Sequence, residues 1–213
     1  MSGGAQARGE LDNQSIGDFL GQLAARMAAP GAGATAAVEA ALSASLVAMV
    51  GRFTTDEEHA DSVREIVAAA DARRDACLAA AADDETAFSA VAEAMKMPSD
   101  TTAAKEGRRR RLSQASLDAT RPPLAILASS AELVELAGRM LPIANRKLVS
   151  DVAAATAAAR AAATTARLAV EANLAAIDDD AARAGLVSAV AEVEDLTRRA
   201  DQVEAEVRKV IQG

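Results

Sequence analysis

Two short segments of this 213-residue chain carry residue types that could bind a small polar ligand. The first holds Gly31 and Gly33 directly before an alanine-rich helix, where backbone N–H groups at the helix N-terminus can face an anion or a polar group. The second holds Asn145, Ser150 and Asp151 and also leads into an alanine-rich helix. Each segment alone also fits a plain turn with a helix cap. Together they predict two helix N-termini that meet at one ligand-binding crevice of a bundle.

The single histidine and the single cysteine argue against metal and thiol chemistry. His59 lacks the further His, Cys or carboxylate side chains that a metal site needs at ligand spacing, so we expect a solvated side chain and no metal site. Cys77 falls on the apolar face of a predicted helix, which indicates a buried, unreactive thiol. One cysteine cannot form an intramolecular disulfide, and a reduced, cytoplasmic compartment is therefore expected.

The charge pattern disfavours nucleic-acid and membrane partners. The chain has 23 Lys and Arg residues against 31 Asp and Glu residues, and its net charge of −8 opposes binding to phosphates. Four consecutive arginines, residues 108–111, would point to all sides of a helix and are expected to be solvated. The longest apolar tracts are dominated by small residues and interrupted by Glu39 and Arg160, which is typical of buried helices rather than membrane spans.

The elements that position these segments are predicted to be helices. Hydrophobic residues make up 51% of the chain and aromatic residues only 1%, so the core must consist largely of Ala and Leu, which have high helix propensities, with Val, Ile and Met. No segment longer than a few residues alternates between apolar and polar positions, which leaves no candidate strand. We therefore expect an all-α, multi-helix bundle with long Ala-rich central helices, in one domain over residues 15–213 after a flexible leader of residues 1–14. Helices are predicted over about 15–29, 34–53, 56–97, a segment around 108–121, 124–140, 150–177 and 180–211.

Several short motifs occur in an order and at spacings that match one known family. They are Ile16-Gly17-Asp18-Phe19-Leu20, the turn of residues 30–35 with residues 48–54, Asp83-Asp84 with Ala87-Phe88, residues 94–98, Pro122-Pro123-Leu124, Asn145 with Ser150-Asp151, and Asn173-Leu174. On these motifs the chain, from about Ser15 to Val210, resembles the cyclodeaminase/cyclohydrolase family of folate enzymes. That family includes the C-terminal domain of formiminotransferase-cyclodeaminase and methenyltetrahydrofolate cyclohydrolase. Departures from the family pattern are Ala32 and Ala34 in a turn that usually reads Pro-Gly-Gly-Gly-Ser, Arg52 in place of a polar residue such as Asn or Gln, Ala144 in place of glycine and Ala169 in place of asparagine.

The resemblance implies a helical domain that acts on one-carbon forms of tetrahydrofolate. Relatives convert the formimino form to the methenyl form with loss of ammonia, or hydrate the methenyl form to the 10-formyl form. Which of these lyase and hydrolase reactions applies here stays open. Both pass through a tetrahedral carbon between two folate nitrogens and need a group that moves protons. The resemblance also implies a homodimer, a small-molecule folate partner, and no required metal or redox cofactor.

The resemblance further assigns roles to particular residues. Asp151, in the matching Ser-Asp motif, is the expected general acid or base, because the chain offers no suitable histidine. Substrate-binding roles are expected for eight residues. The cleft would be lined with backbone donors by Gly31, Gly33 and Thr35, and the ligand or a water would be oriented by Asn145 and Ser150. The folate glutamate would be met by Arg52 or Lys96, and Thr54 is the remaining expected binding residue.

Two other interpretations stay open at this point. The altered glycine turn, Ala169 and the near-heptad spacing of the last helix also fit a non-catalytic protein that keeps the fold for folate-like ligand binding or for helical assembly. A generic coiled-coil adaptor is the third interpretation, although it leaves the polar loops without a purpose. Decay of the methenyltetrahydrofolate absorbance would separate turnover from binding.

Overall fold

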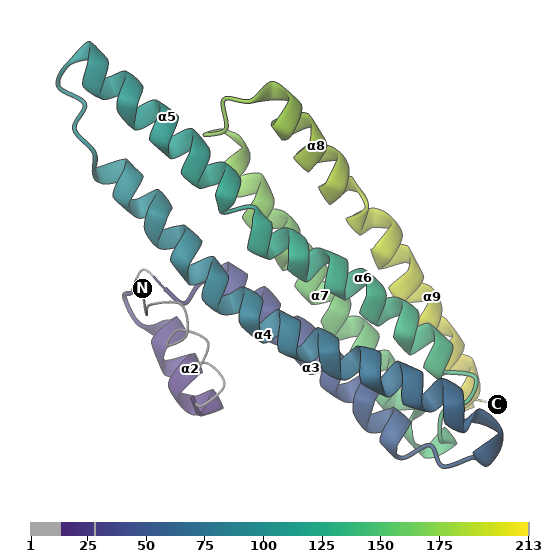
Figure 1. The fold of residues 1–213 in the computed structure, drawn as a ribbon. Helices are drawn as coiled ribbons and strands as arrows, with labels where there is room; N and C mark the ends of the chain where they lie inside the picture. The colour runs from purple at the N-terminus through teal and green to yellow at the C-terminus, as the bar shows by residue number, and fades with distance from the viewer. Residues whose placement is uncertain (1–13, 28, 213) are drawn as a thin grey trace.

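The structure is a computed structural model and describes residues 14–27 and 29–212. Within these residues every regular element is a helix (Figure 1), which confirms the predicted all-α class. The predicted leader lies outside the described residues apart from Gln14. The α-helices of the described part are α2 (Ile16–Ala24), α3 (Ala32–Arg52), α4 (Ala60–Lys96), α5 (Thr102–Asp118), α6 (Arg121–Met140), α7 (Val149–Leu174), α8 (Asp180–Ala191) and α9 (Val193–Gln212), and the 3₁₀ turns η1 (Glu57–His59) and η2 (Arg146–Leu148) precede α4 and α7.

Helix α3 forms the centre of the bundle because most of its side chains are small. It packs against α4, α6 and α7, and Ala36, Ala37, Ala40 and Ala44 on it are fully buried. Small side chains at a helix contact allow a short distance between the helix axes. By length and composition α3 could also cross a membrane, but 61% of its most apolar window is buried by the rest of the chain, as in the core helix of a bundle.

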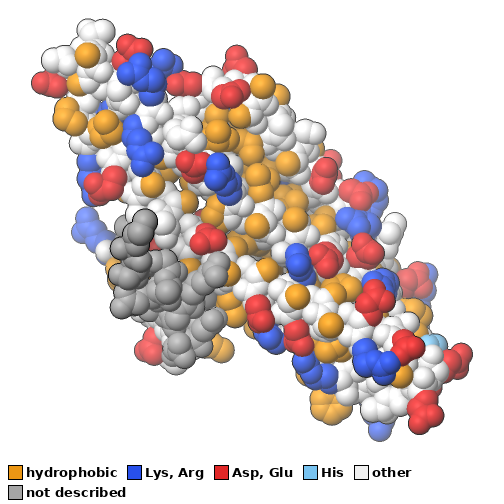
Figure 2. All heavy atoms as spheres, in the orientation of Figure 1, with side chains coloured by type: hydrophobic (Ala, Val, Ile, Leu, Met, Phe, Trp, Pro, Cys, Tyr) orange, Lys and Arg blue, Asp and Glu red, His pale blue; other side chains and the backbone are white. Residues whose placement is uncertain are grey.

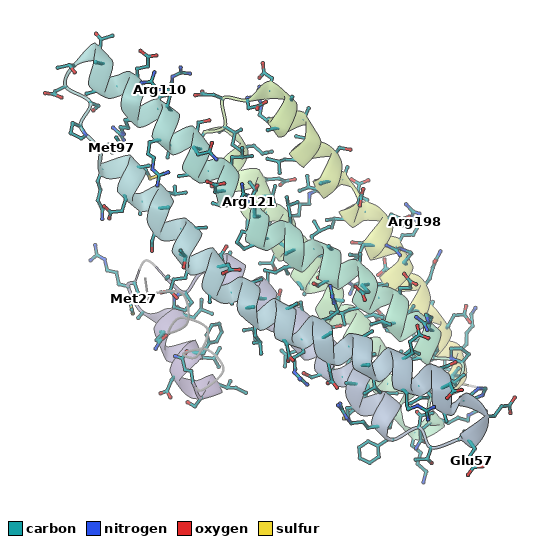
Figure 3. All side chains as sticks on the ribbon, viewed as in Figure 1. Met27, Glu57, Met97, Arg110, Arg121 and Arg198 are labelled. Carbon is teal, nitrogen blue, oxygen red and sulfur yellow. The ribbon has the colours of Figure 1, made fainter. Side chains whose placement is uncertain are left out.

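Helices α3 and α7 run in opposite directions along the bundle. The N-terminal end of α3 shares a cleft with Ala169 and Asn173, which lie near the C-terminal end of α7. At the other end of α3, Thr54 is hydrogen-bonded to Asn145, which precedes α7. Glu57, just after α3, accordingly lies at the end of the bundle farthest from Met97 at the tip of α4 (Figure 3).

Helices α4 and α5 form a hairpin that extends past the central helices (Figure 1). Helix α4 has 37 residues, which corresponds to about 55 Å at 1.5 Å per residue. The hairpin has a small core of its own, to which α4 contributes Val91 and Ala94 and α5 contributes Ala115 and Ala119. The hairpin helps to form the site because the C-terminal half of α4, from Ala81 to Met95, lines a cleft at the N-terminal end of α3.

The four arginines of α5 belong to a surface of mixed charge. Arg109 pairs with Asp178 at 3.0 Å, and Arg110 pairs with Glu106 at 2.8 Å. Figure 2 shows acidic and basic side chains interspersed over this face of the molecule. Arg109 and Arg110 therefore form surface ion pairs of the kind expected for a solvated stretch.

Several helix boundaries differ from the sequence prediction, and α2 ends at Ala24 rather than near residue 29. Pro122 and Pro123 lie in the first turn of α6, where a missing N–H costs no hydrogen bond, instead of in the gap before the helix. The predicted last helix is interrupted at Glu192, between α8 and α9. The near-heptad face of α9 packs within the bundle against α7, and Leu196 and Val207 on it are buried.

Candidate active site

A cleft with a volume of about 560 Å³ opens at the N-terminal end of α3. The turn with Gly31 and Gly33 forms one wall, α4 contributes Asp84 and Phe88, and α7 contributes Asn173. A further side is bordered by Met27, Ala29 and Pro30, which lie between α2 and α3. A concave site of this size is typical of pockets for small molecules.

Asp84 is a half-buried carboxyl side chain in this cleft. Its carboxylate lies so close to Gly33 that a side chain on the glycine would have no room. Burial raises the pKa of Asp84 above its ordinary value, and no described residue opposes this shift with a hydrogen bond or an ion pair. Such a group can hold a proton at a pH where an ordinary aspartate is ionised, which suits a general acid or base.

The sequence contains a signal for Asp84 that the motif-based assignment missed. On α4, Asp84 follows Cys77 by seven residues and Ala81 by three, and these two side chains are 1% and 3% exposed. This spacing places all three on one helix face, so the carboxylate points toward the bundle. The neighbouring Asp83 and Glu85 are acidic too and both are exposed, although Glu85 also lines the cleft. Packing of α4 on α3 therefore makes Asp84 the half-buried carboxyl of the three.

Replacement of Asp84 with Asn is expected to stabilise the fold at neutral pH. Because the pKa of Asp84 is raised from 3.8 in the folded state, that state binds more protons than the unfolded chain between the two pKa values. The free energy of unfolding of the wild type therefore falls as the pH rises through this window, whereas the neutral amide avoids the loss. Thermal unfolding at several pH values measures this effect. Asp83→Asn should reproduce the wild-type curve, and a lower thermal midpoint for Asp84→Asn at neutral pH would contradict the expectation.

The other walls of the cleft combine apolar surface with polar side chains, among them the amide of Asn173. Phe88, 45% exposed, and Met95 come from α4, and Ala169 comes from α7. Asn173 Nδ2 donates a hydrogen bond to the backbone oxygen of Ala169 at 2.9 Å. This bond fixes the orientation of the amide, since a carbonyl can only accept, and Asn173 Oδ1 stays without a partner among the described residues. The cleft thus offers apolar contact for a ring and an acceptor for an N–H group.

The second segment predicted to bind ligand lies at the opposite end of α3 and makes structural hydrogen bonds. The N–H of Asn145 donates to Thr54 Oγ1 at 3.1 Å, and Asn145 Nδ2 donates to the backbone oxygen of Phe53 at 3.3 Å. Thr54 Oγ1 donates to the backbone oxygen of Val50 at 2.9 Å, and Asn145 Oδ1 accepts from the N–H of Lys147 at 3.1 Å. Thr54 and Asn145 therefore tie the end of α3 to the turn before α7.

Replacement of Thr54 with Val is expected to destabilise the fold by about 1–2 kcal/mol. The change leaves the N–H of Asn145 without its acceptor, and an unsatisfied group costs its desolvation energy. Chemical denaturation measures the free energy of unfolding. Thr55→Val, at the exposed neighbouring position, serves as the control and should stay near wild type. Equal stability of the two variants would show that the hydrogen bond contributes nothing.

The prediction that the two helix N-termini share one crevice is wrong within a single chain. Helix α3 has 21 residues, so its ends are about 30 Å apart, and the antiparallel α7 begins at the end away from Gly33. Asp151 does not line the cleft. Leu148 holds the cap position of α7, so neither Ser150 nor Asp151 caps this helix. The catalytic role of Asp151 stays a prediction that the geometry of one chain does not support.

Three further residues expected to bind substrate do not line the cleft and contact other parts of the protein instead; they are Thr35, Arg52 and Lys96. Of the glycine-turn residues, Gly31 and Gly33 do line it. Ser150 is exposed on α7 beside α9. The contacts of the three are Thr35 Oγ1 to the backbone oxygen of Gly31 at 3.0 Å, Arg52 to Asp71 at 2.5 Å and Lys96 to Glu93 at 2.8 Å.

Cys77 and His59 supply no reactive group to the cleft. Cys77 is buried as expected, and burial is the main cause that raises the pKa of its thiol, against a hydrogen bond with Ser129 and the charge of Arg73. The thiol is therefore protonated and a poor nucleophile. His59 is half-buried at the start of α4 rather than fully solvated. In residues 14–27 and 29–212 no three His, Cys, Asp or Glu side chains gather as metal ligands would.

Comparison with known proteins agrees with the resemblance seen in the motifs. The crystal structure of formiminotetrahydrofolate cyclodeaminase from Thermotoga maritima has the same fold, with a TM-score of 0.81 at 24% sequence identity over 96% of this chain and 98% of that chain. A search of curated proteins finds no match. The family model described as formiminotransferase-cyclodeaminase matches residues 15–192. Because this match covers most of the chain, the chain belongs to the formiminotransferase-cyclodeaminase family.

Proposed function

We propose that this chain is a one-carbon folate enzyme whose active site is the cleft at the N-terminal end of α3. The observation that carries the proposal is the Asp84 carboxyl, which is half-buried in the cleft against Gly33 and has a raised pKa. Family membership makes a tetrahydrofolate derivative the expected ligand. Phe88 and Met95 would contact the pterin ring, and Asn173 Oδ1 would accept a hydrogen bond from one of its N–H groups.

Cyclodeamination is the reaction that this site suits best. The folate N10 attacks the formimino carbon and its proton passes to the amino nitrogen, which forms the tetrahedral carbon. Protonated Asp84 then donates a proton to the amino nitrogen, ammonia leaves, and the methenyl bridge between N5 and N10 remains. The raised pKa of Asp84 favours this role because the acid must be protonated when the amine departs. Solvent returns the proton to Asp84, and no step of this scheme uses a metal or a redox cofactor.

Hydration of the methenyl form is the second candidate reaction. It is supported by the partial exposure of Asp84 to the cleft, which allows the ionised carboxylate to take a proton from a water. That water would add to the methenyl carbon while its proton passes to Asp84. The bond between this carbon and N5 would then break as Asp84 returns the proton to N5, and loss of the hydroxyl proton to solvent would leave the 10-formyl form. The two reactions use the same carboxyl in opposite protonation states.

The deciding experiment is an assay of the purified chain with each folate form. With 5-formiminotetrahydrofolate, release of ammonia together with methenyl absorbance supports the cyclodeaminase. With 5,10-methenyltetrahydrofolate, decay of the absorbance above the buffer rate supports the cyclohydrolase. Tight folate binding with neither reaction would overturn the proposal and favour a non-catalytic binding protein.

A further inference from the structure

Gly33 lies where any side chain would collide with Asp84. A Cβ atom built on Gly33 would stand 2.1 Å from Asp84 Oδ2 and 2.2 Å from both Asp84 Cγ and Asp84 Oδ1. Non-bonded heavy atoms prefer separations of roughly 3.5 Å or more, so the whole carboxylate would have to move. All three of the nearest atoms belong to Asp84. The closest obstacle to a side chain at Gly33 is therefore the Asp84 carboxylate.

Backbone conformation does not explain the glycine at this position. No glycine among the described residues has a positive φ. Gly31, in the same turn, has nothing within 4 Å of its own Cβ position. Ala32 and Ala34 already carry methyl groups on either side of Gly33, and Ala34 is only 4% exposed. Within this turn, Gly33 is therefore the position at which a side chain would be least tolerated.

We infer that Gly33 is a positioning residue for the proton-transfer group: its missing side chain lets the Asp84 carboxylate lie in the cleft against the first turn of α3. The inference rests on the proposed function, in which Asp84 moves the proton. This role is separate from the expectation that Gly33 binds substrate through its backbone N–H. It also accounts for the two departures from the family turn, because methyl groups at Ala32 and Ala34 leave the carboxylate of Asp84 in place.

A methyl group on Gly33 would displace the Asp84 carboxylate by more than about 1 Å, the distance needed to restore ordinary contacts. Misplacement of a reacting group by about 1 Å can lower the rate by about 10²-fold. A carboxylate pushed out of its position would also be better hydrated, which brings its pKa closer to the ordinary value. A change at Gly33 should therefore affect both the rate and its pH dependence.

The test compares Gly33→Ala with Gly185→Ala in the folate assay. For Gly33→Ala we expect kcat to fall by about 10²-fold with little change in KM, and the limb of the pH profile that reports Asp84 to move to lower pH. Gly185→Ala, at an exposed position of α8 outside the lining of the cleft, should keep the wild-type kcat and pH profile, because its methyl group meets open space. A Gly33→Ala protein with the wild-type kcat and pH profile would overturn the inference.

A second measurement separates this contact from the proposed function. Thermal midpoints are compared for the wild type, Gly33→Ala, Asp84→Ala and the double variant. The shift that Gly33→Ala causes in the wild type should differ from the shift it causes in Asp84→Ala, where the carboxylate no longer occupies the space. An equal shift in both backgrounds would refute the contact. If the wild type converts neither folate form, the proposed function fails, while this cycle still decides whether Gly33 positions Asp84.

Discussion

Replacing Asp84 with Asn is expected to lower turnover of the folate substrate by about 10²- to 10⁴-fold, the usual contribution of a general acid or base. The amide keeps the shape of the side chain, so its fit against Gly33 is retained. It cannot give a proton to the departing amine or take one from a water. KM should change little, because the apolar walls of the cleft are untouched. Steady-state kinetics of the wild type and the variant measure the effect.

Asp83→Asn is the matched control for this substitution. Asp83 is the exposed neighbour of Asp84 on α4 and is absent from the lining of the cleft, so its variant should retain wild-type kinetics. Asp151→Asn, assayed beside them, tests the residue that the motif comparison assigned. If Asp84→Asn keeps the wild-type rate while Asp151→Asn loses it, the proton-transfer group is not Asp84.

The largest expected loss of stability follows from enlarging an alanine in the core. Ala159 on α7 is fully buried, and α7 packs against α3, α6 and α9. A leucine there must force neighbouring side chains or whole helices apart, because closely packed cores have no spare volume. We expect Ala159→Leu to destabilise the fold by about 1–3 kcal/mol. For a chain of this size that corresponds to a fall in the thermal midpoint of at least about 2–4 °C.

Ala161→Leu is the matched control, because it makes the same alanine-to-leucine substitution outside the core. Ala161 lies on the exposed side of the same helix, so a leucine there needs no space in the core, and leucine also has a high helix propensity. Thermal unfolding of the two variants should therefore differ clearly. If both variants unfold at the same temperature, close packing of alanines is not what holds α7 in the bundle.

The helical architecture was predictable because its causes are local. Ser15 accepts a hydrogen bond from the N–H of Asp18 at the start of α2, as its position before an apolar face indicates. Alanine-rich segments without alternation could only be helices, and the length and order of the motifs indicated the family. The break at Glu192 and the start of α6 at its prolines were harder to predict, because neighbouring helices help to set where a helix ends.

The site was predicted only in part. Gly31 and Gly33 do line a cleft, as the glycine turn before an alanine-rich helix indicated. The expected partner segment with Asn145 is instead a structural tie at the far end of α3, since its hydrogen bonds are made to Thr54 and Phe53. The carboxyl group near the glycines is Asp84, one of three consecutive acidic residues on α4.

The sequence by itself determined that this chain is a bundle of helices with a core of small side chains and that it resembles one family of folate proteins. Propensity, periodicity and motif spacing depend on residues close together in the chain, so they can be read without coordinates. Only the tertiary structure decided that α7 runs antiparallel to α3 and that Asp84 stands against Gly33. Both depend on contacts between residues distant in sequence, where the direction of packing and the space left by one missing side chain determine which groups meet.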